Sequence, residues 1–170
     1  MIVVTMGVCG SGKTSAGMTI ASRMGWTFIE GDDLHPAVNR EKMASGQPLT
    51  DEDRWPWLDS IADRMRKIDQ SGQSAVVACS ALRQVYRDRL RNSGADLCFL
   101  HLTGDASMIR RRMESRHGHY MPPGLLDSQL ATLEPARPGE TLHEIDISGT
   151  VDEITEAALR LLSGGAARAG

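Results

Sequence analysis

Hydrophobic residues gather in short runs along the chain, and longer stretches of mixed polarity separate these runs. The runs cover Ile2–Val8, Trp26–Ile29, Ala75–Cys79, Leu97–Leu102 and, more weakly, Glu144–Ile147. Runs that are apolar at nearly every position are typical of strands covered on both faces, because a half-exposed strand alternates polar and apolar residues. The pattern predicts an α/β fold with three layers, in which a five-stranded parallel sheet is flanked by helices.

The stretches between the predicted strands carry signals for helices. One helix is expected from Lys13 to about Met24, where Gly25 can act as the C-cap. Thr50 precedes acidic residues that favour the positive end of a helix, and an apolar stripe suited to one helical face follows. The stripe consists of Trp55, Leu58, Ile61, Met65 and Ile68. Asp105 can cap a further helix, and the span Val151–Leu162 is expected to form the last one.

Composition and length fit one globular domain. The chain has 170 residues, of which 41% are hydrophobic and 24% charged, and its formal net charge is −3. The charge gives no reason to expect nucleic acid or a membrane surface as a partner. We expect the domain to cover residues 1–163 and a disordered tail to cover residues 164–170.

Cysteine usage and the N-terminal residues favour a cytoplasmic protein. Cys9, Cys79 and Cys98 are odd in number and far apart, which favours reduced thiols over disulfides or a zinc site. No basic segment precedes the first apolar run, and that run is too short to span a bilayer. We therefore expect neither a signal peptide nor a transmembrane helix.

A phosphate-binding motif directly follows the first predicted strand. Residues 7–14 read Gly-Val-Cys-Gly-Ser-Gly-Lys-Thr and match G-x-x-x-x-G-K-[ST] at every required position. Glycines allow backbone N–H groups to surround phosphate oxygens, and the N-terminus of the next helix adds partial positive charge. The residues expected to bind ATP in this region are Gly7, Gly10, Ser11, Gly12, Lys13, Thr14 and Ser15. Lys13 would also act in catalysis at the β- and γ-phosphates, and the Thr14 hydroxyl would ligate Mg²⁺. The alternative is a glycine-rich turn that carries Lys-Thr by chance, and the strand–loop–helix context disfavours it.

Acidic residues follow the second predicted strand, at Glu30, Asp32 and Asp33. Ligands of open α/β sheets collect at the carboxyl ends of the strands. A carboxylate there can hold a metal-bound water or accept the proton of an attacking hydroxyl. We assign Asp32 the role of base or acceptor-orienting residue and Glu30 a role at the metal. A solvated acidic loop is the alternative, and local features alone do not decide between the two.

The region after the second strand contains motifs that are specific in combination. They are His35-Pro36, Asn39, Lys42-Met43, Gly46, Pro48-Leu49, Asp51, Asp53-Arg54, Pro56-Trp57-Leu58, Cys79-Ser80-Ala81-Leu82, Tyr86-Arg87, Gly118-His119 and the segment from Gln129 to Glu134. With these motifs, residues 2–162 closely resemble the gluconokinase family of P-loop sugar-acid kinases. The resemblance implies a nucleoside-monophosphate-kinase-like fold, ATP with Mg²⁺, phosphorylation of D-gluconate at its terminal hydroxyl to 6-phosphogluconate, and a homodimer. Many relatives have Asp-x-Asp where this chain has Glu30-x-Asp32, so the position of Asp32 carries more weight than the metal role of Glu30.

Gluconate is an open-chain polyol with a carboxylate, and the residues in these motifs suit it. Arg54 can bind a carboxylate through two parallel hydrogen bonds. The residues expected to contact the substrate are Asp32, His35, Asn39, Lys42, Arg54, Ser80 and Arg83. Structural roles are the alternatives: His35 can stabilise a turn, Arg54 can pair with Asp51 on a helix surface, and Trp57 can belong to the core.

A cationic run follows the fourth predicted strand and contains Arg110, Arg111, Arg112 and Arg116. In kinases of this shape a mobile lid folds arginines over the transferring phosphoryl group, and we expect such a lid at about residues 112–125. Arg112 and Arg116 are four residues apart and so share a helix face, while Met108, Ile109 and Met113 should face the core. We expect Arg112 to bind ATP and Arg116 to be catalytic, although the sequence does not select the arginine that meets the γ-phosphate. In related folds the adenine lies after the last strand, here near residues 148–151. A solvated basic face is the alternative to a lid.

Three other functions remain open from the sequence. A shikimate kinase would carry a Gly-Gly-Gly turn after the third strand, where this chain has Cys79-Ser80-Ala81-Leu82. An adenylate-type kinase would use a nucleotide acceptor. A regulatory module without catalysis would have no need for Lys13, Thr14, Asp32 and the lid arginines together.

Overall fold

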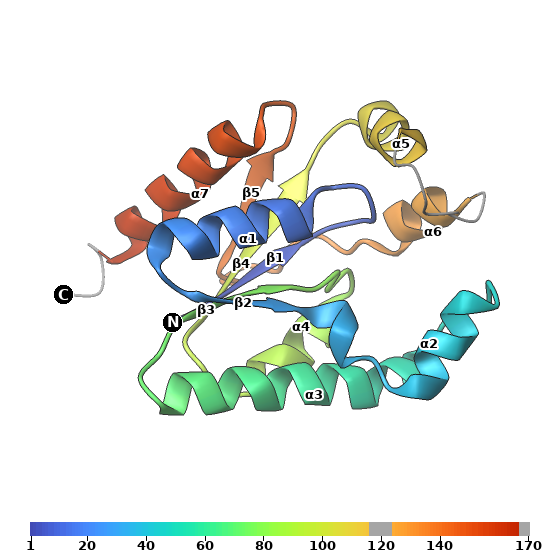
Figure 1. Cartoon of the computed structure of the whole chain (residues 1–170), viewed down its shortest axis with the longest axis horizontal. Coiled ribbons are helices and arrows are strands. Elements are labelled where there is room, and N and C mark those ends of the chain that lie inside the picture. Colours follow the sequence, from blue (N-terminus) through green and yellow to red (C-terminus); the bar gives the residue numbers. More distant parts are fainter. Residues whose placement is uncertain (116–123, 167–170) are drawn as a thin grey trace.

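The computed structural model describes residues 1–115 and 124–166, which fold into an α/β structure of three layers (Figure 1). The sheet consists of β1 (Ile2–Met6), β2 (Thr27–Glu30), β3 (Ala75–Ala78), β4 (Leu97–Thr103) and β5 (Leu142–Asp146). The strands pair in parallel throughout, in the order β2-β3-β1-β4-β5. The predicted fold class and the five parallel strands are thus confirmed.

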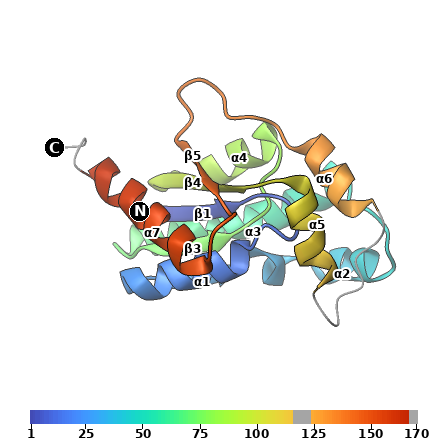
Figure 2. The same cartoon turned by 90° about the horizontal axis from the view of Figure 1, so that it is seen from above.

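Helices cover both faces of the sheet. They are α1 (Lys13–Met24), the short 3₁₀ helix η1 (Gly31–Leu34), α2 (Ala37–Ala44), α3 (Asp51–Gln70), α4 (Gln84–Arg91), α5 (Ala106–Glu114), α6 (Leu125–Thr132) and α7 (Val151–Ala166). Helices α1 and α7 lie on one face, and α3 and α4 lie on the other (Figure 1). Helices α2, α5 and α6 gather at the end of the sheet where β1 leads into α1, as Figure 2 shows from above. This end of the sheet therefore carries the candidate site.

Strand β1 shows why the apolar runs have no alternation. Val3 belongs to the hydrophobic cluster under α1 and α7, together with Ile20 and Ala158. Ile2 and Val4 belong to the opposite cluster under α3 and α4. Because helices bury both faces, the strand is apolar at every position except Thr5, whose buried hydroxyl donates to the Lys13 carbonyl at 3.2 Å.

The predicted helix boundaries agree with the cap geometry. Gly25 ends α1 in the left-handed conformation, with φ 67°. Thr50 and Asp53 form a reciprocal capping box at the start of α3. Asp105 accepts hydrogen bonds from two backbone N–H groups of α5. Helix α7 runs to Ala166, however, so residues 164–166 of the predicted tail continue the helix, and residues 167–170 lie outside the described part.

Helices α2, α4 and α6 were not indicated by the apolar pattern, and strands β1 and β3 end earlier than predicted. Val8 and Cys79 lie in the loops that follow those strands. Within residues 1–115 and 124–166, no helix is both long and apolar enough to cross a membrane.

Candidate active site

The loop between β1 and α1 has glycine at three positions with positive φ, and two of them also lie in close contact with neighbouring residues. Gly7 has φ 139° and Gly10 has φ 78°, which side chains rarely adopt. A Cβ on Gly7 would lie 2.8 Å from the Leu102 carbonyl oxygen, and a Cβ on Gly10 would lie 2.5 Å from Cγ of Met113. Gly12 is the N-cap of α1 and provides no side chain as a capping group. The first N–H groups of α1 are therefore available to an anion.

Two side chains of the loop reinforce this anion site. The hydroxyl of Ser11 is buried and has no hydrogen-bond partner among the described residues. A buried hydroxyl without a partner is costly, so it indicates a ligand that supplies one. The Lys13 ammonium donates to the Val8 carbonyl at 2.9 Å. Burial lowers the pKa of Lys13, and the negative charge of Asp32 is the largest influence that opposes this shift.

The carboxylates after β2 lie beside the loop. The Thr14 hydroxyl donates to Oε2 of Glu30 at 2.7 Å, so the two predicted metal ligands are brought together. Asp32 lies in η1 and is exposed, close enough to Lys13 to affect its pKa. Gly31 lies between the two acids, and a Cβ there would approach the Ala78 carbonyl oxygen to 2.3 Å. The short turn from Glu30 to Asp32 thus depends on close contact between β2 and β3.

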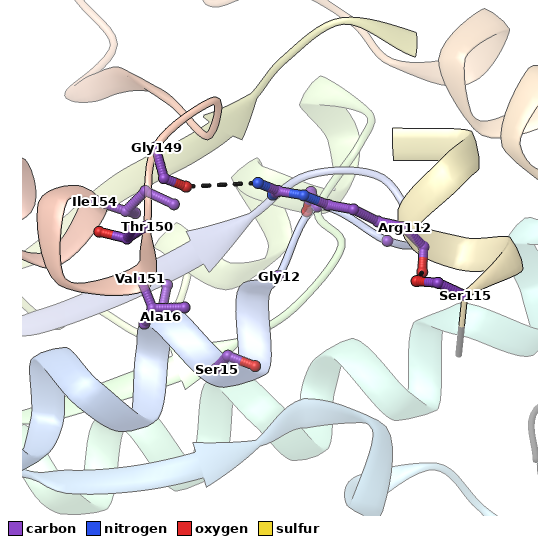
Figure 3. A pocket seen from close by; sticks show the side chains of 11 residues that line it. Gly12, Ser15, Ala16, Arg112, Ser115, Gly149, Thr150, Val151 and Ile154 are labelled. Carbon is purple, nitrogen blue, oxygen red and sulfur yellow. Dashed lines mark hydrogen bonds between the residues drawn. The ribbon is translucent and has the colours of Figure 1, made fainter. Parts of the chain in front are cut away.

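A pocket of about 370 Å³ adjoins the outer side of the loop (Figure 3). Its walls come from the loop and α1 (Gly10, Ser11, Gly12, Ser15, Ala16), from α5 and its C-cap (Arg112, Ser115), and from the turn before α7 and its first residues (Gly149, Thr150, Val151, Ile154). The Arg112 guanidinium donates to the Ile147 carbonyl at 2.7 Å and reaches the Gly149 carbonyl at 3.5 Å. Ser15 and Arg112 thus lie in one pocket with the residues 149–151, near which adenine was expected. Sequence reasoning missed Ser115 and Ile154, which carry no motif.

On the opposite side, His35 lies in a structural cluster. Its ring stacks on Trp57 with 4.1 Å between centroids and 12° between planes, and it is 5% exposed. Burial lowers the pKa of His35, so the imidazole is neutral at pH 7. The Trp57 Nε1–H donates to the Gly31 carbonyl at 2.7 Å, which fixes the turn that carries Asp32. Trp57 is therefore a core residue, which was the structural alternative considered from the sequence.

Asn39 and Lys42 serve the same cluster. The Asn39 amide donates to the Asp53 carbonyl at 2.7 Å and lies 3.2 Å from Nδ1 of His35. Asn39 is 1% exposed, so its burial gives no support to the predicted direct substrate contact. Lys42 pairs with Asp53 at 2.6 Å and is half-buried. Both residues anchor α2 to the start of α3.

Arg54 and Arg83, two of the residues predicted to contact the substrate that accepts the phosphoryl group, both lie beside the Tyr86 ring. We call this part of the site the acceptor side. The guanidinium groups of Arg54 and Arg83 lie 5.6 Å and 5.5 Å from the centre of the Tyr86 ring. Asp51 pairs closely with Arg83, and it accepts a hydrogen bond of 2.5 Å from the Tyr86 hydroxyl. The hydrogen bond from Tyr86, followed by that from Arg83, lowers the pKa of Asp51.

Arg54 has weaker partners than Arg83. It donates to the Leu49 carbonyl at 2.7 Å, but it lies 4.0 Å from Asp51. The predicted pairing of Arg54 with Asp51 is thus present as a long contact. Asp51 and Tyr86 lay within the motifs, although the sequence did not indicate their roles.

Ser80 completes the part of the site that the structure describes. Its carbonyl accepts a hydrogen bond of 3.3 Å from the Gly7 amide, so the loop after β3 touches the phosphate-binding loop. The next residue, Ala81, has a φ of 44°, a left-handed conformation that is costly for alanine. Arg116 and most of the predicted lid lie outside the described residues.

The parallel sheet, the glycine loop on α1 and the carboxylates after β2 define a P-loop kinase. The family model for an AAA domain matches residues 2–136. The gluconokinase of Gluconobacter oxydans is 47% identical over 147 residues, which cover 86% of this chain and 82% of that protein. A crystal structure of a gluconokinase from Sinorhizobium meliloti superposes with a TM-score of 0.86 at 44% identity, covering 99% of this chain and 97% of the other. A sugar kinase from Janibacter gives a TM-score of 0.90 at 46% identity, with 95% and 94% covered. The chain belongs to the gluconokinase family.

Proposed function

We propose that this protein transfers the γ-phosphoryl group of ATP to the terminal hydroxyl of D-gluconate and releases 6-phosphogluconate and ADP. The observation that carries the proposal is the arrangement around Asp32. The charge of this carboxylate acts on Lys13 of the phosphate loop and also on His35, so Asp32 lies near both residues. The charges of both Asp32 and Arg54 affect the pKa of His35, so the three groups are neighbours.

The nucleotide side provides donors for the phosphates of ATP. The unpartnered hydroxyl of Ser11 and the N-terminus of α1 suit phosphate oxygens, and Lys13 can leave the Val8 carbonyl for the β- and γ-phosphates. The pocket beside Gly149 and Arg112 would hold the nucleoside. The resulting concentration of positive charge stabilises the transferring phosphoryl group.

Mg²⁺ belongs to the proposal, and Thr14 and Glu30 would hold it. Their oxygens lie 2.7 Å apart beside the phosphate loop, and hard oxygen ligands are those that Mg²⁺ prefers. When bound, the ion would neutralise charge on the phosphate oxygens.

The acceptor side provides a cation for the gluconate carboxylate. Arg83 already pairs with the carboxylates of Asp51 and Glu134, whereas Arg54 donates to the Leu49 carbonyl and the Tyr86 hydroxyl and has a carboxylate only at 4.0 Å. Arg54 is therefore the better candidate to bind the substrate carboxylate. With the carboxylate held there, the far end of the extended chain would face Asp32, which can accept the proton of the attacking hydroxyl.

The remaining parts of the proposal concern the lid, the source of ATP and the oligomeric state. Arg116 within a lid at about residues 112–125 would exclude water and contact the phosphoryl group. Cytoplasmic ATP is the proposed phosphoryl source, and the proposed homodimer can be checked by light scattering.

A coupled assay of ADP release tests the function. D-Gluconate, glucose, shikimate and nucleoside monophosphates are compared as acceptors in the wild type, in Arg54→Ala and in the control Arg66→Ala. Gluconate should be the best acceptor, because glucose leaves Arg54 without an anion and shikimate is too rigid to span the same distance. Arg54→Ala should raise KM for gluconate about tenfold or more with little change in KM for ATP. If another acceptor is better, or if Arg54→Ala affects ATP alone, the gluconate assignment fails.

A further inference from the structure

Helix α6 and the residues after it contact both loops of the site, although no proposed contact with ATP or gluconate lies there. Oε1 of Gln129 accepts a hydrogen bond of 2.6 Å from the backbone N–H of Cys9, in the phosphate-binding loop. The two residues are separated by 120 positions in the sequence. Gln129 thus connects α6 to the part of the phosphate-binding loop just before Gly10.

Glu134 makes the matching contact on the acceptor side. Its Oε2 accepts a hydrogen bond of 2.5 Å from the backbone N–H (the main-chain amide) of Gln84, and its own backbone N–H donates to the Leu82 carbonyl at 2.8 Å. Its Oε1 lies 3.5 Å from Nε of Arg83. Glu134 thus fixes the end of the loop that contains Ser80 and orients Arg83.

The segment between these two residues is well anchored. Leu126, near the start of α6, is buried in the cluster under α1 and α7. Leu133 packs against this cluster and also against the opposite one. The segment therefore has a fixed position relative to both faces of the sheet, and it can hold two loops at a constant spacing.

We propose that Gln129 and Glu134 are positioning residues that keep the nucleotide loop and the acceptor loop in register. Gln129 acts on ATP through the Cys9 amide, and Glu134 acts on gluconate through Arg83 and the loop after β3. The acceptor half of this inference rests on the proposed function. The inference therefore predicts that a change at Gln129 affects only the binding of ATP, and that a change at Glu134 affects only the use of gluconate.

The nucleotide half is tested with Gln129→Met, which keeps the length of the side chain and removes the acceptor. Loss of one hydrogen bond to a backbone amide should weaken the binding of a non-hydrolysable ATP analogue about five- to twentyfold in calorimetric titration. Gln129→Glu keeps an acceptor oxygen and should restore much of the affinity. Ser128→Ala, an exposed neighbour on α6, is the control and should bind like the wild type.

The acceptor half is tested with Glu134→Ala, which removes the acceptor of the Gln84 amide and the partner of Arg83. The value of kcat/KM for gluconate should fall about three- to tenfold, while the affinity for the ATP analogue stays unchanged. Glu134→Gln keeps an oxygen for the Gln84 amide and should recover part of the loss. Thermal melts of all variants are recorded alongside.

The outcomes separate this inference from the proposed function. If the wild type does not phosphorylate gluconate, the proposed function and the acceptor half fail together, and the analogue titration still decides the nucleotide half. If the wild type is active, equal effects of Gln129→Met and Glu134→Ala on both substrates, or no effect, would overturn the inference. Variants that melt below the assay temperature would also overturn it, because the residues would then support the fold and not the spacing of the loops.

Discussion

Replacing Glu140 with Gln should destabilise the folded protein by about 3 kcal/mol at pH 7. Glu140 pairs with Arg87 at 2.6 Å, and their side chains are 2% and 0% exposed. Burial by itself would raise the pKa of Glu140, but hydrogen bonds from Arg87, Arg91 and the Arg137 amide lower it from 4.5 to about 2. At about 1.4 kcal/mol per pKa unit, this difference corresponds to about 3 kcal/mol of stability that depends on the charge. Loss of one partner of a buried ion pair typically costs a similar amount.

The pH dependence has a definite sign. The pKa of Glu140 is lower in the folded state than in the unfolded state, so the stabilisation is complete well above pH 4.5. It is lost as the pH falls from about 4.5 towards 2. At about pH 3.5 most unfolded chains are protonated at this residue while folded chains are not, so about 1.4 kcal/mol of the difference should have disappeared.

Urea denaturation followed by circular dichroism measures this effect in wild type and Glu140→Gln at pH 7 and pH 3.5. Asp63→Asn is the matched control, because Asp63 pairs with Arg66 at 2.6 Å but the two side chains are 55% and 44% exposed. An exposed pair of this kind should contribute less than about 0.5 kcal/mol. A difference below about 1 kcal/mol between Glu140→Gln and wild type, or one that is the same at both pH values, would refute the reasoning.

Three further predictions concern the reaction. Lys13→Ala should reduce the rate at least about 10²-fold with an unchanged thermal melt, and near-normal turnover would remove Lys13 from the mechanism. Asp32→Asn should lower kcat strongly while calorimetry finds nearly normal ATP affinity, since the amide keeps the shape but cannot accept a proton; lost affinity with intact kcat would place Asp32 on the nucleotide side. Thr14→Ala should shift the dependence of activity on Mg²⁺ concentration to higher values while Thr14→Ser does not, and identical Mg²⁺ curves for the two variants would contradict the assigned ligand.

Much of the fold followed from local sequence patterns. The phosphate loop, the caps at Gly25, Thr50 and Asp105, and the five strands are specified by residues next to one another, so the sequence could predict them. Helix α4 was not predicted from the sequence, because its buried face contains Arg87 beside Tyr86 and Leu90. A buried arginine interrupts the apolar periodicity that indicates a helix. Helices α2 and α6 are only eight residues long, so their patterns were too short to detect.

The candidate site was predictable only in part. Thr14 and Glu30 are brought together because both lie at the carboxyl end of the parallel sheet, Glu30 as the last residue of β2 and Thr14 in the first turn of the helix that follows β1. The contacts between Gln129 and Cys9 and between Glu134 and Gln84 depend on how distant segments pack, which no local spacing encodes. For the same reason the sequence could not predict that the Asn39 side chain donates its hydrogen bond to the Asp53 carbonyl.

The distribution of charge on the acceptor side supports a substrate that brings its own carboxylate. The chain as a whole is slightly acidic, so an anion cannot be attracted by the overall field of the protein. Arg83 and Lys42 are each paired closely with a carboxylate of α3. Arg54 lies 4.0 Å from Asp51, so its guanidinium has no close carboxylate partner among the described residues and can pair with an incoming anion. A neutral sugar would have to bind beside a guanidinium that it cannot satisfy, whereas gluconate would complete the cluster, and this difference can supply selectivity without any change in the fold.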